Sequence, residues 1–166
     1  MNHLRTLKRA VLLRHLRRRF AIDWDGPHGA GHWVRVRKNG LILSKTTGAN
    51  IKVIELFAFF HDSCRVDESG DPDHGKRGAD LAVKLRGEFF EASDSEMDLL
   101  IEACGGHSDG DVDADVTVAT CWDADRLDLG RVGIYPDPIF LCTDAAKDPA
   151  IIDWAYQRSL DRRIDA

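Results

Sequence analysis

The chain has 166 residues, 43% hydrophobic and 31% charged, which is ordinary for one globular domain and too short for two. A mild net charge of −5 argues against a molecule whose whole surface binds nucleic acid. The apolar runs are too short to span a bilayer, and no sustained apolar segment follows the basic N-terminus as in a secretion signal. The cysteines are scattered without a CxxC pair, so we expect a cytoplasmic protein with reduced thiols.

The first twenty residues contain no acid, and apolar residues recur among their basic side chains at three- and four-residue spacing. The apolar positions are Leu4, Leu7, Val11, Leu12 and Leu16. This pattern predicts a basic amphipathic helix within residues 1–22, packed through its apolar stripe on a domain formed by residues 23–166. The basic face is either a solvated surface or a contact for phosphates of a substrate, a nucleic acid or a membrane surface.

A Gly/Pro-rich loop over residues 23–31 holds His28 and leads to a second predicted helix over residues 32–45. His32, Val36, Gly40 and Leu43 lie on or near one face of that helix. A glycine in mid-helix costs about 1 kcal/mol relative to alanine. We therefore expect another helix to approach closely at Gly40.

The stretch 51–65, IKVIELFAFFHDSCR, predicts the central helix of the fold. Its first ten residues are apolar on nearly every side, and a helix without a polar face belongs in the interior. His61 and Asp62 stand at its buried end, where polar side chains need partners. Taken alone, the pair is better explained as a capping aspartate beside a hydrogen-bonded core histidine, so the other His and Asp residues must decide whether it binds a metal.

Three further helices are predicted downstream. One runs over residues 74–86 from His74, and one runs to Cys104 from the capping-box pair Ser93 and Glu96, with His107 following Gly105-Gly106. Residues 115–131 form another, with a strand at residues 116–118 as the alternative. The acidic loop 108–115 lacks the glutamate of an EF-hand, which excludes that calcium motif.

A terminal helix over residues 149–163 completes the predicted set. No stretch repeats the period-two alternation of a sheet. The sequence therefore predicts an all-α, single-domain bundle of about six or seven helices.

Imidazole and carboxylate groups at the predicted helix ends suit a divalent transition metal ion such as Mn, Fe, Co, Ni or Zn. Their order resembles the HD-domain superfamily of metal-dependent phosphohydrolases over residues 28–134. The resemblance rests on HWVRV at His32, LFAFFHDSCR at His61-Asp62 and DADRLD at residues 123–128. DPDHGKRGA and GGHSDG resemble that family's auxiliary histidine positions.

This resemblance implies that His32, His61, Asp62 and Asp125 hold one metal ion. Asp62, His74 and His107 are then catalytic, the two histidines contacting phosphate or moving protons. A second ion is the less favoured alternative, because the dinuclear branch of the superfamily has more histidines here. Asp123 is an alternative ligand or an acceptor that orients a ligand histidine. Asp128 is expected to be a surface acid.

For phosphate and substrate contacts we expect His28, Arg65, Lys76 and Arg77. Trp33 and Trp122 are expected in the core, with base stacking as the alternative. The resulting hypothesis is a phosphomonoesterase or phosphodiesterase acting on a nucleotide or another small phosphorylated molecule. The alternatives are a hydratase or iron-dependent oxygenase of the same fold, or a nucleic-acid or partner-binding module that uses the basic helix and a structural metal.

Overall fold

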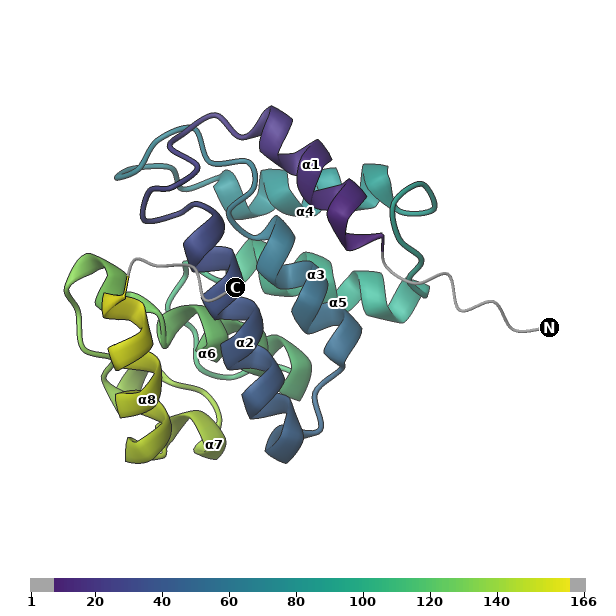
Figure 1. The fold of residues 1–166 in the computed structure, drawn as a ribbon. Coiled ribbons are helices and arrows are strands. Elements are labelled where there is room, and N and C mark those ends of the chain that lie inside the picture. Colours follow the sequence, from purple (N-terminus) through teal and green to yellow (C-terminus); the bar gives the residue numbers. More distant parts are fainter. Residues whose placement is uncertain (1–7, 162–166) are drawn as a thin grey trace.

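The computed structural model describes residues 8–161, which form eight α-helices and two short 3₁₀ helices without a β-strand (Figure 1). The α-helices are α1 (Arg9–Arg19), α2 (Ala30–Thr47), α3 (Ile51–Phe60), α4 (His74–Leu85), α5 (Asp94–Gly106), α6 (Val116–Arg126), α7 (Asp144–Lys147) and α8 (Pro149–Leu160). The 3₁₀ helices are η1 (Leu129–Val132) and η2 (Pro138–Phe140). The all-α prediction is confirmed, and the strand alternative at residues 116–118 is wrong because these residues begin α6.

Helix α3 lies in the middle of the bundle, as its apolar sequence predicts. Every residue from Val53 to Phe60 is buried. The helix starts where the Asn50 side chain accepts a hydrogen bond from Val53 N, which satisfies one of its free N-terminal amides. Helices α2, α5 and α6 pack around it, and Figure 1 shows α2 and α3 side by side at the centre of the molecule.

Two glycines allow helices to approach where a larger residue would clash. A Cβ atom on Gly40 of α2 would lie 2.5 Å from Ile54 Cγ2 of α3, so the predicted close approach is confirmed. A Cβ atom on Gly75 of α4 would lie 2.2 Å from the Cys104 carbonyl oxygen of α5. This second approach brings the start of α4 against the end of α5, where His74 and His107 lie.

The basic helix is α1, and residues 1–7 of the predicted segment lie outside the described part of the chain. Leu12 and Leu16 are fully buried, which confirms the apolar stripe. Arg9 forms an ion pair with Glu55 of α3 at 2.6 Å. The Arg17 guanidinium lies 5.5 Å from the ring centre of Trp24. Part of the basic charge therefore attaches α1 to the domain.

The C-terminal helices α7 and α8 pack at one end of the bundle, at the lower left of Figure 1. They close over a second apolar cluster that includes Leu43, Leu127, Leu141 and Ile152. The predicted terminal helix is present from Pro149 to Leu160, and Asp148 caps it by accepting from Ala150 N. Over residues 8–161, no helix has both the length and the apolar character required to cross a membrane.

Candidate metal centre

Five helix ends meet at one place in the fold and bring together six side chains that could bind a metal ion. These are His32 at the start of α2, His61 and Asp62 after α3, His74 at the start of α4, His107 after α5 and Asp125 in the last turn of α6. Helices α2 and α4 begin at this point, and helices α3 and α5 end there. The acidic loop over residues 108–115 then leads back across the bundle, so that α6 also ends at this point.

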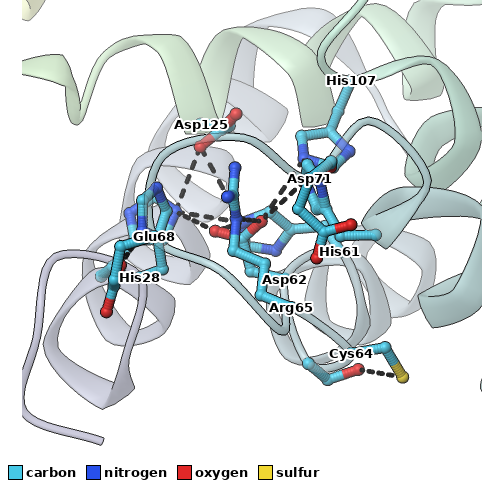
Figure 2. A network of polar contacts seen from close by, with 12 residues as sticks. His28, His61, Asp62, Cys64, Arg65, Glu68, Asp71, His107 and Asp125 are labelled. Atoms are coloured by element: carbon cyan, nitrogen blue, oxygen red, sulfur yellow. Dashed lines mark hydrogen bonds and ion pairs between the residues drawn. The ribbon is translucent and has the colours of Figure 1, made fainter. Parts of the chain in front are cut away.

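The Asp62 carboxylate is the centre of the cluster, and Figure 2 shows its contacts to both sides. Its Oδ2 lies 3.4 Å from His32 Nε2 and 3.5 Å from His61 Nε2. Its Oδ1 lies 3.1 Å from His74 Nε2 and 3.5 Å from His107 Nε2. Two groups of potential ligands, each with atoms within 4.8 Å of one another, thus share one carboxylate.

The hydrogen bonds of the four histidines fix their tautomers. In every case an oxygen atom accepts a hydrogen bond from Nδ1, so the neutral imidazole carries its lone pair on Nε2. The accepting oxygens are Asp128 Oδ2 for His32 at 2.7 Å, the Phe57 carbonyl for His61 at 3.0 Å, the Asp71 carbonyl for His74 and the Cys104 carbonyl for His107 at 2.7 Å. In the neutral form, which is the form that binds metals, all four rings would present the Nε2 lone pair to Asp62.

This arrangement fits a cation. His32 Nε2 and His61 Nε2 are 3.0 Å apart, and His74 Nε2 and His107 Nε2 are 2.9 Å apart. Two lone pairs at such a distance repel unless a metal ion or a proton lies between them. Asp125 Oδ1, 3.1 Å from His32 Nε2, is a buried oxygen without a hydrogen-bond donor among the described residues. Buried groups of this kind are costly unless a ligand satisfies them.

The protonation states follow from the same contacts. Burial lowers the pKa of His61 to about 3, so its imidazole is neutral. Burial and Arg131 also act to lower the pKa of His32, but the adjacent carboxylates of Asp125, Asp128 and Asp62 outweigh them and raise it to about 9. Burial opposes ionisation of Asp62, yet His61 and the other surrounding imidazoles hold the pKa of Asp62 well below its usual range. The carboxylates thus attract positive charge to this point.

Asp128, expected at the surface, is instead fully buried and orients the first histidine. It accepts from His32 Nδ1 and, through Oδ1, from Arg35 Nε at 2.6 Å. The expectation of a surface acid is wrong because the chain turns sharply after α6 and directs this side chain inward. Arg35 lies one turn after His32 on α2, within the HWVRV motif, but the sequence reasoning assigned it no role of its own. Its i+3 spacing from His32 was the available signal.

Asp123 is neither the alternative metal ligand nor the acceptor for a ligand histidine that the sequence predicted. Its two oxygens accept hydrogen bonds from the backbone amides of Cys142 and Thr143 and from the Thr143 hydroxyl, at 2.7–2.9 Å. Asp123 therefore ties the segment before α7 to α6, and it is Asp128 that orients a ligand histidine. Asp125 is the acid of this helix that faces the cluster, as the resemblance implied.

Two arginines lie next to the cluster. Arg65 donates from Nε to Asp62 Oδ1 at 3.1 Å, and its side chain stands in front of the cluster in Figure 2. Arg131, which the sequence reasoning missed, has Nη2 3.9 Å from Asp125 Oδ1 and donates to the carbonyls of Pro27 and Asp128. No residue pattern marked Arg131, because it reaches the site only through the turn formed by η1.

The other expected phosphate contacts are directed elsewhere. Lys76 is exposed and pairs with Asp80 on the same helix at 3.0 Å. Arg77 donates to both Asp71 and the Cys64 carbonyl, so it supports the loop between α3 and α4. These contacts engage both side chains away from the cluster, although α4 begins at it with His74.

His28 lies at the edge of the cluster, where Nδ1 contacts Glu68 Oε2 at 2.5 Å. This pair joins the loop before α2 to the loop after α3, as seen at one side of Figure 2. Burial lowers the pKa of His28, although Glu68 acts in the opposite direction. Nearby, Trp33 and Trp122 are buried and donate to the carbonyls of His28 and Ala103, which confirms their expected place in the core.

No family model, curated protein or solved structure matches this chain. The fold and the site accordingly define an all-α protein with a buried His/Asp cluster capable of holding a metal ion. The likeness to the HD-domain superfamily stays a prediction.

Proposed function

We propose that this protein is a metal-dependent phosphohydrolase whose centre holds two divalent ions bridged by Asp62. The observation that carries the proposal is the division of the Asp62 oxygens, one facing His32 and His61 and the other facing His74 and His107. A carboxylate that bridges two ions is typical of two-metal hydrolytic sites. The second ion, less favoured from the sequence, gains support because His74 and His107 approach each other as closely as the first pair.

The donor set limits the identity of the ions. Four imidazole nitrogens and two carboxylates suit Mn, Fe, Co, Ni or Zn better than calcium or magnesium, which prefer oxygen ligands. A bound divalent ion lowers the pKa of water toward neutrality and polarises a phosphoryl oxygen. In this proposal Asp125 completes the position beside His32 and His61, and Asp128 keeps His32 in the ligating tautomer.

The cations beside the centre supply the phosphate contacts. Arg131 Nη2 makes no hydrogen bond to a described residue, and Arg65 is anchored by Asp62 through Nε and by the Asp67 carbonyl through Nη1. Two guanidinium groups at the border of a carboxylate cluster are well suited to bind phosphate oxygens. Their positive charge neutralises the part of the negative charge of a phosphate ester that the metal ions do not neutralise.

Hydrolysis joins the oxygen of water to phosphorus, breaks the ester P–O bond and delivers a proton to the leaving oxygen. With His74 and His107 engaged as ligands, His28 is the remaining imidazole at the site. Its Nδ1 is held by Glu68, so the lone pair on its Nε2 is available to take the proton that water loses on attack and to pass that proton to the leaving oxygen. The substrate class is a small phosphorylated molecule. Nucleotides belong to this class because the order of the proposed ligands resembles that of the HD-domain superfamily.

The test is release of inorganic phosphate from a panel of phosphate esters, in chelator-treated protein resupplied with each candidate ion. We expect metal-dependent release that Asp62→Ala abolishes and that Asp80→Ala, an exposed acid on α4, leaves unchanged. Equal activity in the Asp62→Ala variant and the wild type would refute the proposal. A protein that binds two ions but hydrolyses no ester would point to the hydratase or oxygenase alternative.

A further inference from the structure

A cavity of about 460 Å³ lies next to the metal centre. Its walls come from the loop before α2, the start of α2, η1 and the end of α8, and include Asp23, Asp25, Gly31, Arg131 and Leu160. The volume falls within the range of small-molecule sites. These elements are distant in sequence, so the cavity is a product of the tertiary fold.

Two arginines connect this cavity to the metal centre. Arg35 and Arg131 both line it. Arg35 also contacts Asp128, and Arg131 Nη2 lies 3.9 Å from Asp125 Oδ1. Gly31, another lining residue, immediately precedes His32. A phosphate group held between the centre and Arg131 would therefore have its organic substituent directed to the cavity.

The lining indicates what kind of organic group fits. The two arginines form ion pairs with Asp128 and Asp125. The carboxylate of Asp25, in contrast, is exposed and accepts no hydrogen bond from a described residue. Asp23 Oδ1 accepts a hydrogen bond from the Asp25 backbone amide at 3.0 Å, and this contact orders the loop. Peptide groups of glycines supply further polar surface. None of the lining residues is aromatic, so the cavity offers no ring on which a nucleobase could stack.

We propose that this cavity binds the organic part of the phosphorylated substrate, and that this part is rich in hydroxyl or amino hydrogen-bond donors. Polyol, sugar or amino-alcohol monophosphates belong to this class. Nucleotides also carry such donors, but the cavity has no aromatic residue on which their base could stack. The inference rests on the proposed function and narrows its substrate class. Asp25 is the specificity-determining residue, because its carboxylate accepts hydrogen bonds from the donors while the metal centre treats every phosphate group alike.

The experiment compares kcat/KM for glycerol 3-phosphate, adenosine 5′-monophosphate and phenyl phosphate, whose leaving group has no hydrogen-bond donor. We expect the wild type to prefer glycerol 3-phosphate. Asp25→Ala should lower kcat/KM for this ester about five- to tenfold, as for loss of one ordinary hydrogen bond at an exposed site, and leave phenyl phosphate unchanged. Asp98→Ala, an exposed acid on α5, is the matched control and should alter neither value.

Preference for the nucleotide, or an equal effect of Asp25→Ala on glycerol 3-phosphate and phenyl phosphate, would overturn the inference. The proposed function would still hold in either case if the protein hydrolysed phenyl phosphate. Hydrolysis of none of the three esters by metal-loaded protein would overturn both. Because Asp25 is exposed and its backbone amide keeps its contact with Asp23, the variant is expected to fold.

Discussion

Replacement of Asp128 by asparagine tests how the protein prepares His32 for a metal ion. In the wild type both carboxylate oxygens accept hydrogen bonds, one from His32 Nδ1 at 2.7 Å and one from Arg35 Nε at 2.6 Å. Asparagine has the same shape but a single acceptor oxygen. If that oxygen faces Arg35, the amide donates to His32 Nδ1 and moves the imidazole proton to Nε2. If it faces His32, the amide opposes a guanidinium donor.

Either arrangement weakens the site without emptying it. Loss of a group that orients a metal-bound histidine typically lowers metal affinity 10- to 100-fold, or about 1.4–2.8 kcal/mol. We therefore expect the dissociation constant of Mn²⁺ or Zn²⁺ to rise by that factor in Asp128→Asn, measured by competition with a chelator of known affinity.

Asp123→Asn is the matched control. Asp123 is equally buried, but it holds the backbone at Cys142 and Thr143. This variant should lower the free energy of unfolding by about 1–3 kcal/mol and leave the metal affinity of the folded protein unchanged. Unaltered metal affinity in Asp128→Asn, or an equal loss in both variants, would refute the argument that Asp128 selects the His32 tautomer.

Three further outcomes are expected. Gly40→Ala should destabilise the protein by about 1–3 kcal/mol, since its Cβ would lie 2.5 Å from Ile54 Cγ2, whereas Gly105→Ala meets no atom within 4 Å and should raise stability slightly in the same denaturant titration. Burial acts to raise the pKa of Glu55, but its partners Arg9 and Arg37 lower that pKa below its usual value of 4.5. The ion pairs of Glu55 therefore stabilise the fold fully above that pH, and this stabilisation disappears as pH falls through the lowered pKa; acid titrations of unfolding should lose this component in Glu55→Gln. Removal of bound metal by a chelator should lower the Tm, because an ion present at 100 times its dissociation constant stabilises the folded state by about 2.7 kcal/mol. An unchanged Tm would contradict binding to the folded state.

The helices and their ends were predictable because the signals are local. Ser93 and Glu96 form the expected capping box, and the apolar stretch after Asn50 is buried as its composition requires. The order of His and Asp residues at those ends also singled out all six side chains that the fold brings together. Residue type and helical position sufficed for this, since a helix end defines where its side chain is presented.

The contacts around the cluster were not predictable in the same way. Asp128 and Arg131 reach the site because the chain tightens into η1 after α6, and no repeating pattern encodes that turn. Lys76 and Arg77 looked suitable from their place at the start of α4, but their direction depends on the path of the preceding loop. Such orientations are fixed by tertiary packing, which a single sequence does not reveal.

The central claim is that Asp62 bridges two metal ions, and the number of ions bound per chain tests it most directly. After equilibrium dialysis against Mn²⁺ or Zn²⁺, elemental analysis should find about two ions per chain in the wild type and about one in His74→Ala, as the two ligand groups require. Asp62→Ala should retain neither at the same free metal concentration. A wild-type protein that binds only one ion per chain, or no more metal than Asp62→Ala, would contradict the account.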